Sequence, residues 1–542
     1  MNRTKESAVA IVALLALIAL PSQLKAQTGP SPGVATVPVA APEQQAPAQP
    51  ATPEKAADEK KLQAAETKPA ESKDKPKTGP IILEGIFKDG FTLRTPDKKS
   101  ELQLKASVQL DSRFYGGDSV APSSFDIRRA RLDFNAKLYD FMAIRIQAAL
   151  EDNPYIRNAF IDIGAHDSFH VRIGQMKVQF SSQWLTLDNQ VDFTERGSAE
   201  PIYPFFDRGI LIWGGVAGQR VVYNLGVYTG AGVDLDYTKG DIDDHKDVAW
   251  RLFFQPFRGG GKAIEGLYLA VQGTYGLNSV PTRRFETRGL MAANFESQIW
   301  RWRTEQIIGT DGRNTDQIGG EIDSRTRLGG ELTYKRGPFS ASAEWAKVDW
   351  DDIQIFHDFY QGSKRLKHEL VMTRDGGAEN LSVWFSYFLT GEEKTFDNFG
   401  WRQPNPLNPW GPGLPGKGAW EVLARFSSTE TDALLFDTAK VRGFTAADLG
   451  ATAPPTPGVG NSVNAAVLDG AAKVLEASLG LNWTMNYNFR VLCTYTYLWV
   501  PDFVAGKNGI VSAGNSDLQD VTVKNTLVEN EQMIALRFIF RL

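Results

Sequence analysis

The chain has 542 residues, a formal net charge of −5 and a single cysteine, Cys493. One cysteine excludes an intrachain disulfide, and the acidic balance argues against nucleic acid as a partner. After the first 26 residues, no run of about 18 apolar residues occurs, which excludes ordinary transmembrane helices. If the chain spans a membrane, it must therefore do so as a β-barrel.

Residues 1–26 have the pattern of a secretory signal peptide. Arg3 and Lys5 precede an apolar run from Ala8 to Leu20, and Leu24-Lys25-Ala26 is an acceptable cleavage site. The apolar run is too short to span a bilayer as a helix. We therefore expect the chain to be exported.

Residues 27–80 consist mainly of Ala, Pro, Glu, Gln and Lys and contain no aromatic residue. Such a segment buries too little apolar surface to offset the entropy of ordering it, so we expect a disordered periplasmic linker. A transient helix around residues 51–70 stays open. The arm could contact the cell wall, and the sequence names no specific partner.

From residue 81 to residue 542 the sequence alternates between apolar and polar residues, which is typical of β-strands. In the last dozen residues, Ile534, Leu536, Phe538, Phe540 and Leu542 share one face, opposite Arg537 and Arg541. One apolar face and one partly charged face suit a wall between lipid and water. We predict an all-β fold, a transmembrane antiparallel β-barrel of about 16 strands preceded by the disordered arm.

A soluble β-sandwich is the alternative fold. A single sandwich rarely exceeds about 200–250 residues, whereas residues 81–542 keep one strand pattern without a dividing linker. Tight turns alternate with long polar connections, which we place at residues 351–378, 391–418 and 429–472. Short turns at one end and long loops at the other are typical of an outer-membrane barrel.

The faces opposite the apolar ones would line the lumen, and their cations outnumber their carboxylates. The inward carboxylates are Asp133, Glu151, Asp162, Glu305, Glu331, Glu344, Glu421 and Glu476. The inward cations are Arg129, Arg131, Lys137, Arg145, Arg172, Arg251, Arg301, Arg303, Arg325, Arg327, Arg425, Arg490, Arg537 and Arg541. Rings of Arg and Lys are a means by which pores select anions.

Each of these arginines has a second interpretation, in which it pairs with an acid and braces the wall. Asp133, Glu305 and Glu331 are well placed to accept such pairs. For any single arginine we favour bracing over conduction. Only the collective excess of positive charge favours anions.

The segment Gln179–Arg208 is the expected constriction loop. It is long, and it carries aromatic residues such as Trp184 and Phe206 that could anchor it inside a lumen. It also carries Asp188, Asp192, Glu195 and Glu200 against Arg196 and Arg208. An acidic loop that faces an arginine wall suits a general diffusion pore as well as a selective one.

Several segments resemble the phosphate-selective porin O and P family. They are Phe125–Phe134, Val171–Phe180, Thr194–Gly197 and Asp207–Gly209. The resemblance covers roughly residues 81–542 and implies a sixteen-stranded outer-membrane barrel, a homotrimer, with basic residues that draw phosphate-like anions to a constriction. It places the candidate anion contacts at Arg129, Arg131, Lys177, Arg196 and Arg208. The acidic loop and the terminal Leu542 depart from the family pattern.

No enzymatic chemistry, cofactor or metal site is expected, because the five histidines show neither metal-ligand nor catalytic spacing. We expect a passive channel in the outer membrane of a Gram-negative-type bacterium, selective for small anions such as phosphate or polyphosphate. Two alternatives remain. The first is a general diffusion porin with weak selectivity. The second is a structural protein that tethers the outer membrane through its N-terminal arm.

Overall fold

The computed structural model describes residues 83–87, 89–117, 123–151, 154–230, 244–261, 263–277, 300–302, 306–450, 457–503 and 530–542. The expected signal peptide and the whole of the expected linker lie outside these residues, and so do residues 231–243. Within the described ranges, no helix is long and apolar enough to cross a membrane.

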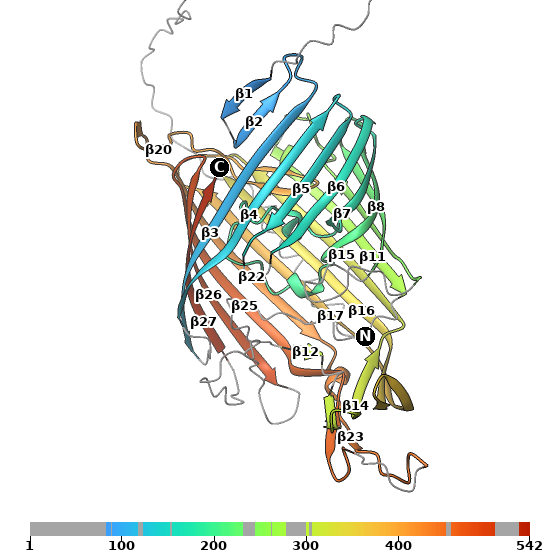
Figure 1. Ribbon diagram of the computed structural model, residues 1–542. Helices are drawn as coiled ribbons and strands as arrows, with labels where there is room; N and C mark the ends of the chain where they lie inside the picture. Colours follow the sequence, from blue (N-terminus) through green and yellow to red (C-terminus); the bar gives the residue numbers. More distant parts are fainter. Residues whose placement is uncertain are drawn as a thin grey trace, which may run out of the picture. The chain divides into compact units, whose positions relative to one another are not determined.

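Sixteen of the described strands form a closed antiparallel ring (Figure 1). Each strand pairs with the next in the ring, and the last, β27, pairs with the first, β3, from Glu531↔Gly117 to Arg541↔Ser107. The ring consists of β3 (Glu101–Gly117), β4 (Ser124–Leu138), β5 (Met142–Ala149), β6 (Tyr155–His166), β7 (Phe169–Lys177), β8 (Phe206–Val216), β9 (Val221–Tyr228), β10 (Asp247–Phe254), β11 (Leu267–Leu277), β15 (Ser324–Arg336), β16 (Phe339–Gln361), β17 (Lys364–Phe388), β22 (Ala419–Thr431), β25 (Leu468–Thr484), β26 (Phe489–Phe503) and β27 (Asn530–Arg541). The predicted barrel and its strand number are confirmed.

The alternation in the sequence sorts side chains between the outside and the inside of the ring. On β27, Ile534 and Phe538 are 47% and 50% exposed, whereas the intervening Arg537 is fully buried. The outward face is therefore apolar and the inward face polar, the reverse of a soluble barrel. Because every strand has two neighbours, no backbone edge is left in the lipid.

Short turns gather at the end of the barrel where the chain terminates (Figure 1). Between β4 and β5, Tyr139 and Asp140 both take positive φ angles, 54° and 64°. Two successive left-handed residues give the twist that matches a two-stranded hairpin. A small sheet of β1 (Glu84–Phe87) and β2 (Phe91–Arg94) extends β3 at this end.

The predicted loop at residues 351–378 is wrong, because this segment is strand. β16 and β17 continue as one long hairpin up to the pair Gln361↔Lys364, and β14 (Asn314–Glu321) pairs with the outer half of β16. The polar residues there alternate with buried apolar ones such as Ile353 and Ile355, both 0% exposed. Period-two alternation, not overall polarity, marks the strand.

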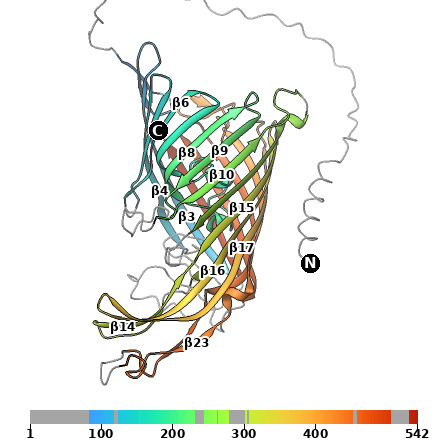
Figure 2. The ribbon, with the colours of Figure 1, turned by 90° about the vertical axis from the view of Figure 1, so that its right-hand side faces the viewer.

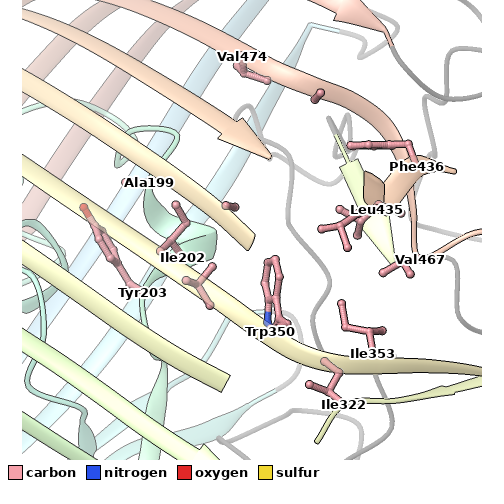
Figure 3. Close-up of a cluster of buried hydrophobic side chains, with 14 of the residues drawn as sticks. Ala199, Ile202, Tyr203, Ile322, Trp350, Ile353, Leu435, Phe436, Val467 and Val474 are labelled. Atoms are coloured by element: carbon pink, nitrogen blue, oxygen red, sulfur yellow. The ribbon is translucent and has the colours of Figure 1, made fainter. Parts of the chain in front are cut away.

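This extension lies at the end opposite the C-terminus, where Figure 2 shows β14 and β23 (Ala439–Arg442). β13 (Gln306–Thr310) pairs with β14, β23 pairs with β24 (Ser462–Ala465), and β12 (Trp300–Trp302) pairs with β25. Apolar side chains hold the extension together, and Figure 3 shows Trp350, Ile353, Leu435, Phe436 and Val467 among them. Short 3₁₀ turns complete the loops at η2 (Ala263–Gly266) and η4 (Ala433–Phe436).

The connection between β17 and β22 lies at the same end as the short turns, although it is long. It holds two small hairpins, β18 (Thr395–Asp397) with β19 (Gly400–Arg402), and β20 (Trp410–Gly411) with β21 (Leu414–Pro415). Neither hairpin pairs with the barrel ladder. The expectation that long connections occupy one end only is therefore wrong.

Candidate solute path

The constriction loop, defined here as residues 178–205, joins β7 to β8 and folds into the lumen. Its helical turn α2 (Ser182–Leu185) begins at Ser181, whose hydroxyl accepts a hydrogen bond from the backbone N–H of Trp184 at 3.2 Å. Trp184 is 1% exposed and packs against the rings of Phe205 and Phe206. A second turn, η1 (Glu200–Ile202), leads back to the wall. Aromatic anchoring inside the barrel was predicted and is confirmed.

One side of the loop is held by the glutamate wall, which we define as Glu331 on β15, Glu344 on β16, Glu421 on β22 and Glu476 on β25. The backbone N–H groups of Ser182, Gln183 and Ser198 donate to Glu331, Glu344 and Glu476 respectively, each at 3.0 Å. A carboxylate that accepts from a backbone amide forms a strong, charge-assisted hydrogen bond. These wall acids therefore fix the loop in place.

Two cations on the strands brace the glutamate wall. Arg251 on β10 pairs with Glu331, and Arg425 on β22 pairs with Glu476. All four of these side chains are almost completely buried. For these two arginines, the bracing interpretation is the one that the geometry supports.

The other side of the loop faces an arginine wall, which we define as Arg113 on β3, Arg128, Arg129 and Arg131 on β4, Arg157 on β6 and Arg537 on β27. The loop carboxylate of Glu195 accepts from Arg128 Nε at 2.8 Å and from Arg537 Nη2 at 3.0 Å, and it pairs with Arg113. Its second oxygen lies 3.8 Å from Arg129 Nη2. One carboxylate therefore serves four guanidinium groups.

Asp188, which precedes Glu195 in the loop, also contacts several arginines. Its oxygens lie 2.7 Å from Arg196 Nη2, 3.1 Å from Arg157 Nη2 and 3.6 Å from Arg129 Nε. Burial raises the pKa of Asp188, but the attraction of Arg157, Arg196 and Arg129 outweighs it and holds the pKa well below its ordinary value. For Glu195, the attraction of Arg128, Arg113 and Arg537 likewise outweighs burial and keeps the pKa low. Both loop carboxylates are therefore ionised.

Arginines outnumber carboxylates among the described residues where the loop meets the arginine wall. The described cations in contact with Asp188, Glu195 or Asp111 are six arginines: Arg113, Arg128, Arg129, Arg157, Arg196 and Arg537. Six guanidinium groups therefore share three carboxylates in these contacts, or four if Glu200, 3.4 Å from Arg196, is counted.

The predicted lumen cations fall into two groups. Arg129, Arg131 and Arg537 lie on the arginine wall, and Arg131 also pairs with Glu151. The others lie away from it and have partners of their own: Arg145 with Asp133 at 2.7 Å, Arg172 with Asp162 at 2.7 Å, Arg325 with Asp247 at 2.6 Å, and Lys137 with Asp140 at 2.6 Å in the β4–β5 turn. Arg327 donates to the carbonyl oxygen of Ile202 at 2.8 Å. The side chain of Arg301 and all of Arg303 and Glu305 lie outside the described residues.

The predicted constriction residues occupy four positions. Lys177 ends β7 and donates to the carbonyl oxygen of Trp184 at 2.6 Å, so it holds the loop from its base. Arg208 lies on β8, not in the loop, and donates to Gln175 at 3.2 Å. Asp192 faces away from the arginine wall and accepts from Lys394 at 2.7 Å. Asp188, Glu195 and Arg196 form the contact with the wall.

Sequence alternation missed Arg113, Arg128, Arg157 and Asp111. Arg128 and Arg157 are missed because each is the extra residue of a β-bulge. Pairing on β4 passes from Arg129 to Ile127, and pairing on β6 passes from Asn158 to Ile156. A bulge puts two consecutive residues opposite one and re-aims a side chain. Arg113 and Asp111 could have been found, because they alternate with Leu110, Ser112 and Phe114.

A closed ring of sixteen described strands with an apolar outer face and a loop folded inside defines a porin of the bacterial outer membrane. The chain belongs to the family described as phosphate-selective porin O and P, whose model matches residues 101–499. No curated protein matches the sequence.

Solved structures of two outer-membrane proteins resemble the chain at low identity. The first is OmpT of Vibrio cholerae, with 10% identity over 82% of this chain and 98% of that chain and a TM-score of 0.43. The second is the outer-membrane channel DcaP of Acinetobacter baumannii, with 11% identity over 84% of this chain and 99% of that chain and a TM-score of 0.41.

Proposed function

We propose that this porin passes small anions in preference to cations, with inorganic phosphate or polyphosphate as the preferred solute. The observation that carries the proposal is the excess of guanidinium groups where the constriction loop meets the arginine wall. A cation in this region meets net repulsion, whereas an anion meets several donors in succession.

The loop carboxylates occupy positions that a passing oxyanion would take. Glu195 and Asp188 each bind several arginines through oxygens that resemble those of phosphate. Planar guanidinium groups bind carboxylate and phosphate oxygens in the same forked geometry. An entering phosphate would exchange with these carboxylates at the arginines, so the arginines would not have to lose all their partners at once.

The second candidate is a general diffusion porin with weak selectivity. Its support is that several described lumen arginines of other strands are paired with acids, such as Arg145 with Asp133 and Arg172 with Asp162. Paired arginines brace the wall and add little net field. The two candidates differ in how strongly the channel discriminates between anions and cations.

We propose that the porin assembles as a homotrimer, as the family resemblance implies. Contact of residues 27–80 with the cell wall, and the tether function built on it, concern residues outside the described ranges. No enzymatic step is proposed, because the lumen offers positioning and charge for a passive channel.

Competition between phosphate and chloride tests the proposal. Single-channel current is recorded in planar bilayers in symmetric KCl, and phosphate is then added to one side. We expect phosphate to block the chloride current in a saturable manner, with block that weakens as salt rises because screening shortens the range of the arginine field. A chloride current that is unaffected by phosphate would favour the general diffusion porin.

A further inference from the structure

A second segment fills the lumen from the end where the short turns lie. We call residues 392–403, which contain the paired strands β18 and β19, the inner hairpin. Phe396 lies 5.6 Å from Phe253 and 5.1 Å from Tyr268, measured between ring centres. Phe253 and Tyr268 are buried and alternate with exposed residues on β10 and β11, so they point into the barrel. The hairpin therefore sits inside the lumen.

The inner hairpin is seated directly on the constriction loop. The backbone N–H of Trp401 donates to Thr186 Oγ1 at 2.9 Å, and the backbone N–H of Gln403 donates to Gln190 Oε1 at 2.8 Å. Lys394, whose side chain is 1% exposed, lies between Asp192 of the loop at 2.7 Å and Glu421 of the glutamate wall. Two segments that enter from opposite ends thus meet in mid-lumen.

The way the hairpin is attached allows it to leave without damage to the barrel. Its strands form a separate two-stranded sheet, so its backbone ladder is internal. It is held by side-chain packing, by a hydrogen bond from Asn224 Nδ2 on β9 to Asn398 Oδ1 at 3.1 Å, and by hydrogen bonds to residues of the constriction loop. Gly391, at φ +92°, stands at its base with open space around it, which suits a hinge.

The seat also explains why the hairpin would return. Phe253, Tyr268, Trp384 and Leu423 form an apolar patch on the inner wall, and Phe396 and Trp401 cover it. Leaving the seat would expose this patch to water, and it would also separate buried Lys394 from its two carboxylates. The seated state is therefore favoured, while the unseated state is a discrete alternative and not an unfolded barrel.

We propose that the inner hairpin is a reversible plug, which must leave its seat on the constriction loop for the pore to reach full conductance. This concerns how much current passes, whichever ion carries it. It is therefore independent of the anion preference, and either proposal can fail alone.

A disulfide lock tests the plug. Gln190→Cys with Gln403→Cys, in a Cys493→Ser background, joins two neighbouring residues, since the side chain of each is hydrogen-bonded to the backbone of the other. The matched control, Thr395→Cys with Arg402→Cys, joins two residues paired within the hairpin, so it stiffens the hairpin without tying it to the loop. Single-channel conductance in symmetric KCl is recorded oxidised and again after reduction.

We expect full-conductance openings to be several-fold rarer in the oxidised lock than in the same channel after reduction, and equally frequent in both states of the control. Equally frequent full-conductance openings in the locked and reduced channels would overturn the proposal. Lys394→Met is a second arm, since it leaves Asp192 and Glu421 to repel each other and should raise the open fraction. Lys394→Arg, which keeps the charge, should stay near wild type. A Lys394→Met channel that opens no more than wild type would also contradict the plug.

Discussion

Arg128 and Arg129 are consecutive residues, yet both contact the same loop carboxylate, Glu195. The bulge on β4 makes this possible, because it removes one residue from the alternation. The same device on β6 brings Arg157 to Asp188. The positive charge of the constriction thus depends on two local irregularities of otherwise regular strands.

Removing one of these charges should weaken anion preference. Arg128 is the wall arginine to change, because its side chain is 29% exposed and its loss leaves no buried acid without other partners. A unit charge about 7 Å from a passing ion in water contributes about 0.6 kcal/mol, a factor of about three in preference. We expect Arg128→Gln to lower the chloride-to-potassium permeability ratio about threefold at low salt. The ratio is obtained from the reversal potential, and Arg220→Gln, an exposed arginine in the β8–β9 turn, should leave it unchanged.

Neutralising the loop acid should act in the opposite direction. Glu195→Gln keeps the shape of the side chain but removes the negative charge that four arginines share. We expect the permeability ratio to rise by a similar factor of about three. A fall in the ratio would contradict this expectation, because removing a negative charge from the path by itself disfavours cations.

The difference between wild type and Glu195→Gln should not depend on pH over a wide range. Nearby arginines hold the pKa of Glu195 well below its ordinary value, so its charge and its attraction to the wall are present above that value. They are lost only as the pH falls through the lowered pKa. We expect the difference in reversal potential to stay constant from pH 7 to about pH 4.5. A midpoint between about pH 5 and 6 would show that the carboxylate is not held by the arginines.

The constriction loop, as an element, is bonded to the glutamate wall on one side and to the arginine wall on the other. The two sets of contacts use different groups of the loop. Backbone amides bind the wall glutamates, and side-chain carboxylates bind the wall arginines. The loop position is thus set by buried charges, not by strand pairing.

Removing one of these contacts should destabilise the constriction loop. Glu331→Leu removes the acceptor for the backbone N–H of Ser182 and leaves Arg251 buried without its carboxylate. Breaking a buried ion pair costs on the order of 3–5 kcal/mol, which we expect as a lower unfolding midpoint and as increased open-channel noise. The control is Glu379→Gln, because Glu379 is exposed on β17. If Glu331→Leu had an unchanged unfolding midpoint and no added open-channel noise, Glu331 would not be needed to hold the constriction loop.

Sequence patterns predict some of these elements and not others. The constriction loop is recognisable because aromatic anchors and charges interrupt the strand alternation between Gln179 and Phe205. The inner hairpin is not, because nothing in its residues tells which side of the wall a connection folds to. Its seat consists of Phe253, Tyr268 and Trp384, which read as ordinary strand residues until their inward direction is known. The bulges at Arg128 and Arg157 cannot be predicted either, because a bulge depends on how two strands pair and not on the residues of one strand.

For the whole molecule, the barrel is the part that the sequence predicts best. Period-two alternation decides which residues face lipid, and Ile534 and Phe538 do so as expected. Ring closure between β27 and β3 follows because an open edge is not tolerated in lipid. The prediction of a loop at residues 351–378 is wrong. These residues belong to β16 and β17, where many polar residues obscure an alternation that continues.

The lipid-facing assignment makes its own prediction. Leu479, on β25, is 61% exposed and should contact acyl chains. Leu479→Lys should destabilise folding into vesicles by about 2–4 kcal/mol if it lies near the midplane. Leu407→Lys, at an exposed residue outside the strands, should change stability by less than about 1 kcal/mol. Urea titration of the vesicle-folded protein measures both, and equal effects at the two positions would contradict the outward assignment of Leu479.

We propose that the arginines, which outnumber the carboxylates they contact at the constriction, make this porin prefer anions. The most direct measurement is the reversal potential of wild-type channels in a planar bilayer across a KCl gradient. We expect a reversal potential displaced toward the chloride equilibrium potential, with a smaller displacement in Arg128→Gln. A reversal potential near zero, or one displaced toward potassium, would contradict it and leave a general diffusion porin whose loop acids cancel the arginine wall.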